Sequence, residues 1–301
     1  MDKKVYTTEE IQAIANNIRK QILGIALKTG GCYLAQACSS AEIVASLYTN
    51  VMNLGPSEGL WEPIPFPGVP GPDNMDYPKG AAYNGNPGTD KDRFFVSCCH
   101  YASVIYSALS AVGRLSPNWV DKFNVDGWNM EMIGAEHSPG FENTAGSLGQ
   151  TISIAAGTAH ARKMAGHTGK CFVMLGDGEI QEGQTWEAIQ AASYYKLDNM
   201  IVVIDANGQQ VEGKIEDQMG LEPLVQRFES FGAKCVEVDG HNIEEFEKAF
   251  EVEHKDKPLV VLCRTLGYTG MKPLEKRWPF LHFVRIGKDE KEEFQKIYDE
   301  M

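Results

Sequence analysis

The chain has 301 residues, a formal net charge of −13 at pH 7 and an apolar content ordinary for a globular protein. The negative charge argues against nucleic acid or an anionic membrane as a partner, although a locally basic site would still admit an anionic substrate. No run of about 18 apolar residues occurs, so no membrane span is expected. The first ten residues, MDKKVYTTEE, are polar and charged, so no leader is expected either.

The seven cysteines are odd in number, and several lie in apolar runs that are typical of a core. This usage favours reduced thiols in the cytoplasm over a disulfide framework. The pair Cys98-Cys99 raises a metal or redox alternative, but no second spaced cysteine pair accompanies it.

The N-terminal third predicts two helices and a long loop. Thr7 to Glu10 resembles a capping box, and residues 9–28 carry apolar side chains at helical spacing. A stretch of small residues then leads into a helix predicted over 40–51. Residues 53–92 are dense in proline and glycine and predict a loop. Its aromatic residues favour a loop that packs on the protein as a lid or interface, with a disordered loop as the alternative (Trp61, Phe66, Tyr77, Tyr83).

The rest of the chain alternates short apolar runs with helical patterns, apart from an irregular segment at 119–146. Strands are predicted at 93–97, 171–175, 200–204, 233–238 and 258–263. Helices are predicted at 101–112, 151–165, 182–195, 221–231, 242–253 and 288–300. This alternation predicts an α/β fold with a parallel sheet sandwiched by helices. No linker divides the chain, so one domain is expected over residues 1–301.

Polar residues follow two neighbouring strands of the predicted sheet. Gly176-Asp177-Gly178-Glu179 comes after the strand at 171–175, and Asn207 follows the strand at 200–204. Ligands of open parallel sheets bind at the carboxyl ends of strands. The side chains of Asp177 and Asn207, with the backbone carbonyl of Gln209, would supply half of an octahedral Mg²⁺ shell. Gly178 would let a phosphate approach the backbone. Two ordinary turns are the alternative.

The flanking sequences carry a resemblance to a known family. GDGEIQEGQTWEA at 176–188 followed by IDANG at 204–208 resembles the thiamin diphosphate motif of the transketolase family, including its split form, in which one gene encodes only the N-terminal half. Three further segments resemble the family: residues 29–48, DRFFVSCCHYA at 92–102 and PGFENTAGSLGQ at 139–150. The resemblance implies a thiamin-diphosphate-binding fold and ketol transfer from a ketose, phosphorylated or otherwise anionic, to an aldose.

The resemblance also implies roles for single residues. Asp177, Asn207 and the Gln209 carbonyl would hold Mg²⁺. The remaining cofactor contacts would come from the glycine turn, two histidines and the segment before residue 150 (Gly176, Gly178, Glu179, His100, His282, Gly146, Leu148). Glu182 would join the two active sites across the dimer, and Tyr33, with the two histidines, would lie at the catalytic centre. Taken alone, His100 and Leu148 would read as core residues and Glu182 as a helix N-terminal acid.

Three positions depart from the family pattern. Cys32-Tyr33 replaces a Gly-His pair, Ser97 to His100 lacks a Lys-Gly pair, and Glu131-Met132-Ile133 stands where Gly-His-Pro is usual, with only His137 nearby. A tyrosine can donate a hydrogen bond but is a poor base at neutral pH. These departures leave cofactor binding intact and predict a non-standard sugar substrate.

Thiamin chemistry also needs a carboxylic acid on the pyrimidine ring. In this family it comes from a second domain that follows the matched part, so the resemblance implies that the partner is a C-terminal transketolase subunit, in an α2β2 heterotetramer. Two alternatives remain open. One is a subunit of another thiamin enzyme, of the 2-oxoacid dehydrogenase or deoxyxylulose-phosphate synthase type. The other is a cofactor-binding subunit without catalysis.

Overall fold

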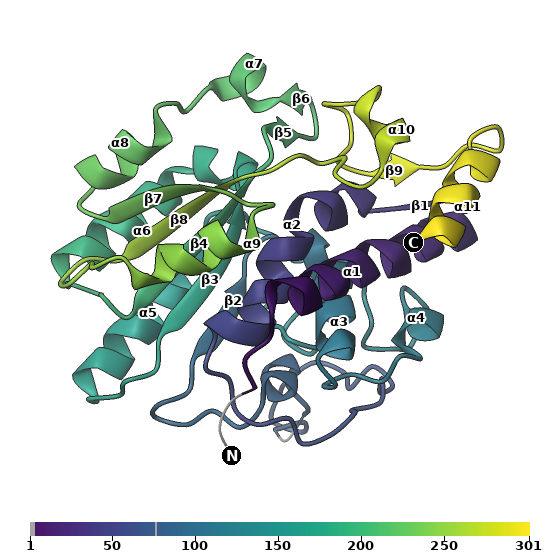
Figure 1. Cartoon of the computed structure of the whole chain (residues 1–301). Coiled ribbons are helices and arrows are strands. Elements are labelled where there is room, and N and C mark those ends of the chain that lie inside the picture. Colours follow the sequence, from purple (N-terminus) through teal and green to yellow (C-terminus); the bar gives the residue numbers. More distant parts are fainter. Residues whose placement is uncertain (1–3, 76) are drawn as a thin grey trace.

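The computed structural model describes residues 4–75 and 77–301, so the first three residues of the charged N-terminal stretch and position 76 of the long loop lie outside it. Its centre is a five-stranded parallel sheet with the strand order β2-β3-β4-β8-β7 (Figure 1). The strands are β2 (Arg93–Val96), β3 (Cys171–Gly176), β4 (Met200–Ala206), β7 (Lys234–Asp239) and β8 (Leu259–Arg264). The predicted α/β fold class is confirmed.

Two hydrophobic cores cover the two faces of this sheet. Consecutive strand residues alternate between them: Phe94 and Phe172 belong to the first core, Phe95 and Val173 to the second. The main helices of the first core are α1 (Thr8–Thr29), α2 (Leu34–Ser46), α3 (Ala102–Ala111) and α9 (Ile243–Lys248). Helices of the second are α5 (Thr151–Met164), α6 (Gly183–Tyr194) and α8 (Leu224–Ser230). Both faces of β3, β4 and β8 are therefore buried, as their continuous apolar runs require, while the edge strand β7 is partly exposed.

The N-terminal prediction is correct for α1 and wrong for the start of α2. Thr7 and Glu10 form the predicted capping box, and Gly30 ends α1 with a φ of 85°. The second helix begins at Leu34 rather than at residue 40, and a π-helical turn at Leu47–Val51 extends it. Every residue of α2 is buried, so it has no polar face and its start produces no periodic signal.

The long loop at 53–92 packs on the protein, as its aromatic residues indicate. Tyr77 and Tyr83 are buried, and the ring of Trp61 lies 4.9 Å from that of Tyr83. Bridges join Trp61 to Leu115 and Pro65 to Trp128. The loop contains one short 3₁₀ helix, Gly80–Asn84.

Short elements complete the fold. The 3₁₀ turns at Cys99–Tyr101, Gly178–Gln181 and Ala249–Glu251 continue strand or helix ends. The two small sheets pair β1 (Gly31–Cys32) with β9 (Val284–Arg285) and β5 (Gln209–Gln210) with β6 (Gly213–Lys214). The remaining helices are α4 (Trp119–Lys122), α7 (Ile215–Met219), α10 (Lys272–Glu275) and α11 (Lys291–Glu300). The short strands β1, β5, β6 and β9 were not predicted from the sequence. Helix α4 lies within the segment at 119–146 that was predicted to be irregular. Among the described residues, no helix is both long and apolar enough to cross a membrane.

Candidate active site

Two adjacent strand ends bring Asp177 and the loop of Asn207 together. β3 and β4 pair in parallel up to Gly176 and Asp205, so both chains leave the sheet at the same edge. The Asp177 carboxylate accepts hydrogen bonds from the backbone of Gly178 at 2.9 Å and of Gly208 at 2.6 Å. The second bond crosses from one strand end to the other, and it fixes the carboxylate beside the loop that follows β4.

Asp205 supports this loop from inside the protein. Its carboxylate is fully buried and accepts hydrogen bonds from Ser39 at 2.6 Å, from Tyr101 at 2.7 Å and from Thr265. The amide nitrogen of Asn207 lies 3.4 Å from the same carboxylate. Because that nitrogen faces Asp205, the amide oxygen faces away from it, where it accepts from the Gln209 backbone at 3.1 Å.

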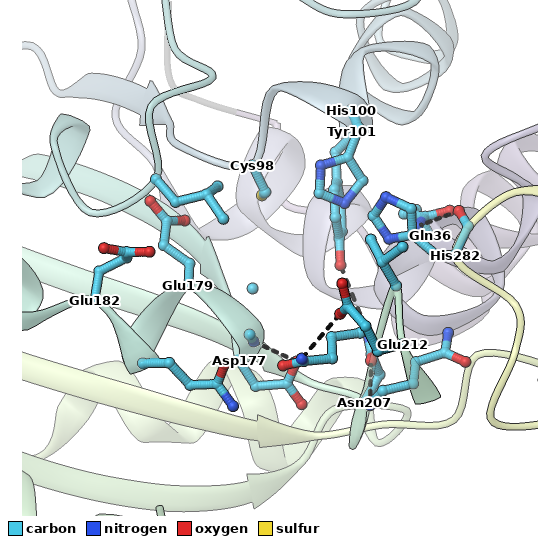
Figure 2. A pocket seen from close by; sticks show the side chains of 17 residues that line it. Gln36, Cys98, His100, Tyr101, Asp177, Glu179, Glu182, Asn207, Glu212 and His282 are labelled. Atoms are coloured by element: carbon cyan, nitrogen blue, oxygen red, sulfur yellow. Dashed lines mark hydrogen bonds between the residues drawn. The ribbon is translucent and has the colours of Figure 1, made fainter. Parts of the chain in front are cut away.

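A cavity of about 270 Å³ opens over the two strand ends. All the predicted site residues except Tyr33 and Gly146 line it: His100, Leu148, Gly176, Asp177, Gly178, Glu179, Glu182, Asn207, Gln209 and His282. Figure 2 shows the two histidines on one side, Glu179 and Glu182 on the other, and Asp177 and Asn207 below. The structure thus gathers residues that lie far apart in the sequence.

The two predicted residues outside the cavity lining lie next to it. Tyr33 is partly buried, and its ring centroid is 5.3 Å from that of His100 and 5.5 Å from that of His282. Gly146 has a φ of 129°, which side-chain-bearing residues rarely adopt, and a Cβ there would lie 3.9 Å from the Cys99 sulfur. Both positions therefore border the segment that carries His100.

The histidine pair is held in its neutral form. The rings of His100 and His282 lie 4.9 Å apart. Burial, and then the neighbouring His282, lower the pKa of His100 to about 3, and burial lowers the pKa of His282 as well. Neutral imidazoles offer one donor and one acceptor nitrogen each, so the pair can hydrogen-bond a ligand without adding charge.

Glu179 has a buried carboxyl group, and only one of its two oxygens has hydrogen-bond partners. One oxygen accepts from Ser97 and, at 2.8 Å, from the backbone of Gly149, while the other is buried without a partner. Burial raises the pKa of Glu179 despite these hydrogen bonds. Glu182, by contrast, is exposed at the rim and precedes α6.

The cavity lining carries four carboxyl groups and no Lys or Arg. Asp177, Glu179, Glu182 and Glu212 all line it, and the histidines are neutral. Burial, and then the Asp205 carboxylate, raise the pKa of Asp177 to about 8. A divalent cation would oppose both causes because it stabilises the ionised carboxylate.

The donor set suits a hard cation. Asp177 offers a carboxylate and Asn207 an amide oxygen, and Gln209 follows in the same loop, all types of oxygen that Mg²⁺ accepts. In the described part of the chain, no group of three or more His, Cys, Asp or Glu side chains could hold a metal. A site with only one carboxylate agrees with this finding, since its other ligands would be amide and carbonyl oxygens.

Several lining residues were missed by the sequence reasoning, among them Gln36, Gln210 and Glu212. Gln36 donates to the His282 carbonyl at 3.1 Å, and its amide oxygen is buried without a partner (Figure 2). Its long polar side chain within a stretch of small residues is the only local feature of the sequence that could have indicated a role in the site. The departures at 131–137 do not line this cavity: Met132 packs against the first core, and His137 lies 2.5 Å from Glu131.

Comparison with known proteins identifies the family. Residues 81–299 match the family model described as transketolase, thiamine diphosphate binding domain. The chain belongs to the transketolase family. A putative uncharacterized transketolase family protein of Sinorhizobium fredii is 31% identical over 289 residues, which cover 95% of this chain and 94% of that protein.

One further relative and one solved structure are similar over nearly the whole of this chain. One of the subunits of the apulose-4-phosphate transketolase of Actinobacillus succinogenes is 28% identical, with 97% of each chain covered. The crystal structure of transketolase from Campylobacter jejuni superposes with a TM-score of 0.78 at 24% identity. That match covers 98% of this chain but only 43% of the solved chain, so this chain spans less than half of that transketolase.

Proposed function

We propose that this chain is the cofactor-binding N-terminal subunit of a thiamin-diphosphate-dependent transketolase, which transfers a two-carbon ketol unit from a ketose to an aldose. The observation that carries the proposal is the joining of Asp177 to the Asn207 loop in a cavity that also holds His100 and His282. The resemblance predicts these four residues together, and they come from four separate segments of the chain, after β2, after β3, after β4 and before β9.

Each lining residue then has a proposed role. Asp177, Asn207 and the Gln209 carbonyl hold Mg²⁺. The glycine turn and the histidines contact the diphosphate (Gly176, Gly178, His100, His282). Gly146, Leu148 and Glu179 contact the ring systems. Bound thiamin diphosphate supplies the carbon nucleophile and the electron sink for cleavage of the ketose.

The catalytic contribution of this chain is to orient groups and to move protons. Tyr33 and the neutral histidines are placed to hydrogen-bond hydroxyl groups of the donor sugar, because their rings form one cluster at the cavity. Glu182 stands at the exposed rim, where it would meet the second active site of the assembly. The replaced histidines at positions 33 and 132 support a non-standard sugar.

The charge of the cavity has two consequences. A diphosphate would meet four carboxyl groups and no Lys or Arg, so its binding depends on the cation. An anionic group on the sugar would find no cationic side chain here either, so the partner subunit must bind it. The name of the Actinobacillus succinogenes relative, a sugar-phosphate transketolase, supports an anionic substrate.

The partner is a C-terminal transketolase subunit that brings the glutamate for the pyrimidine ring, in an α2β2 assembly. The Actinobacillus succinogenes relative is named as one subunit of its enzyme, which supports a partner. A groove between α5 and α6 is lined mainly by small residues and by the half-exposed Tyr195, and the two helices carry further exposed apolar side chains (Ile154, Met164, Tyr194). Such a surface suits close packing of partner helices. Seven free, buried cysteines suit an assembly that works in the cytoplasm.

The test is to purify the chain with its partner subunit, then to assay ketol transfer from a panel of phosphorylated and unphosphorylated ketoses. Asp177→Ala should abolish transfer, because it removes the only carboxylate of the cation site. Glu292→Ala, on the exposed face of α11, is the matched control and should keep full activity. Equal rates for wild type and Asp177→Ala would refute the proposal, and decarboxylation of pyruvate by the complex would favour a 2-oxoacid enzyme.

A further inference from the structure

We propose that His241, which lies outside the cavity, is a positioning residue that holds the loop at 265–270 against the cation and diphosphate site. The inference rests on the proposed function, because that function names the ligands of the site. His241 follows β7 and touches neither the cavity nor the proposed ligand groups. Its effect must therefore pass through the residues that it contacts.

The hydrogen bonds of His241 fix its tautomer. The backbone N–H of Leu266 donates to Nε2 at 2.9 Å. A backbone N–H can only donate, so Nε2 must carry the lone pair and Nδ1 must carry the proton. Nδ1 then donates to the Glu42 carboxylate, 3.1 Å away. Thr269 lies 2.9 Å from Nε2 and also donates to the Leu266 carbonyl, so the imidazole closes one end of the loop.

Glu42 gives the imidazole a fixed, charged anchor. Glu42 and Arg19 are 3% and 2% exposed, and both guanidinium Nη atoms bond the carboxylate, at 2.6 and 2.5 Å. Burial alone would raise the pKa of Glu42, but hydrogen bonds from His241 and Arg19 outweigh it and lower that pKa to about 2. α1 and α2 thus hold His241 through a buried ion pair.

The loop that His241 holds contacts the loop of the cation site. Thr265 donates to Asp205, the carboxylate that faces the Asn207 amide. At Gly267, a Cβ would lie only 2.5 Å from the side-chain nitrogen of Gln209, so Gln209 rests directly on the loop backbone. At Gly270, a Cβ would lie 3.2 Å from Arg19 Cδ. The loop is therefore packed between the Arg19–Glu42–His241 network on one side and Asp205 and Gln209 on the other. Gln209 is itself a proposed cation ligand, and Asp205 contacts the Asn207 amide.

This arrangement restricts which side chains can replace histidine at position 241. The loop needs an acceptor at the Nε2 position, because otherwise the Leu266 N–H loses its partner. Asn places its amide where Nδ1 lies and cannot reach Leu266, whereas the longer Gln can place its oxygen near the Nε2 position. Residues that orient metal ligands from behind typically change metal affinity by about 10–100-fold.

The experiment compares wild type, His241→Asn and His241→Gln, each in complex with the partner subunit. Calorimetry with thiamin diphosphate and Mg²⁺ should give a Kd at least about tenfold weaker for His241→Asn, and His241→Gln should restore most of the affinity. Hydrogen exchange of the Leu266 amide, measured without cofactor, should be faster in the Asn variant only. His254→Asn, at a partly exposed histidine that donates to the Lys257 carbonyl, is the control and should change neither quantity.

Wild-type affinity in His241→Asn, or a Gln variant as weak as the Asn variant, would overturn the role of His241. The same holds if Leu266 exchanges equally fast in all proteins. The exchange measurement needs no cofactor, so it still decides the role of His241 if the wild-type complex takes up no thiamin diphosphate. That last result would count against the proposed function instead.

Discussion

At the scale of single residues, the partly buried His100 makes the stability of the fold depend on pH. His100 has a folded pKa of about 3, while an unperturbed histidine titrates near about 6.5. Between these values the unfolded chain binds a proton that the folded chain does not. The free energy of unfolding should therefore fall as the pH drops below about 6.5 and should not change through His100 above it.

His100→Asn should remove part of this dependence. Urea unfolding at about pH 7.5 and about pH 5 should show a smaller loss of stability for the variant than for wild type. In NMR spectra, the His100 ring signals should not titrate between these two pH values. A histidine that titrates near about 6.5, or equal pH dependence in both proteins, would contradict the buried, neutral assignment.

Asp205 is the residue whose loss should cost most stability. Asp205→Ala would leave the hydroxyl groups of Ser39, Tyr101 and Thr265 without their acceptor inside the protein. Each buried unsatisfied group costs about 1–3 kcal/mol, so a loss of at least about 3 kcal/mol is expected in urea unfolding. Asp299→Ala, on the exposed face of α11, should change stability by less than about 0.5 kcal/mol. Similar values for the two variants would rule out the proposed support of the Asn207 loop.

The sequence alone was enough to predict the site residues that belong to local motifs, but not the residues that contact and hold them. Asp177 and Asn207 could be predicted because each directly follows an apolar strand, and parallel strands end at one edge. Gln36, Glu212 and the His241–Glu42 contact could not be predicted in the same way. They depend on contacts between segments that are remote in sequence, and no local pattern encodes those contacts.

At the scale of elements, α5 and α6 should form the contact with the partner subunit. Ala191 is exposed on α6 and lines the groove between the two helices. Ala191→Arg should abolish co-purification with the partner, because a long charged side chain would fill the groove, while arginine keeps the helix stable. Light scattering after size-exclusion chromatography measures the assembly. Gln295→Arg on α11 is the control, and an intact complex with Ala191→Arg would place the partner elsewhere.

Element prediction succeeded where burial is one-sided or where strands are continuous apolar runs, and it failed elsewhere. α1 has polar and buried faces, and its capping box marks its start. α2 is buried on all sides, so its first six residues carried no helical period. The paired strands β1 and β9 have two residues each and join positions about 250 residues apart, which local propensity cannot reveal.

At the scale of the whole molecule, Asp177 and Asn207, which we propose to bind the cation, lie at one edge of the parallel sheet with a histidine pair and two glutamates (Figure 2). That all of this forms a single domain over residues 1–301 stays a prediction. The net charge of −13 and the carboxyl groups of the cavity support the proposal that the anionic cofactor binds through a cation. The central claim is therefore cation-dependent binding of thiamin diphosphate at Asp177.

Calorimetric titration of thiamin diphosphate into the complex of this chain with its partner tests this claim most directly. With Mg²⁺, we expect saturable uptake of one cofactor per copy of this chain. Excess chelator, or Asp177→Ala with Mg²⁺ present, should abolish the uptake, while Glu292→Ala should leave it unchanged. Uptake that persists in chelator or in Asp177→Ala, or wild type that binds no cofactor, would contradict cation-dependent binding at Asp177.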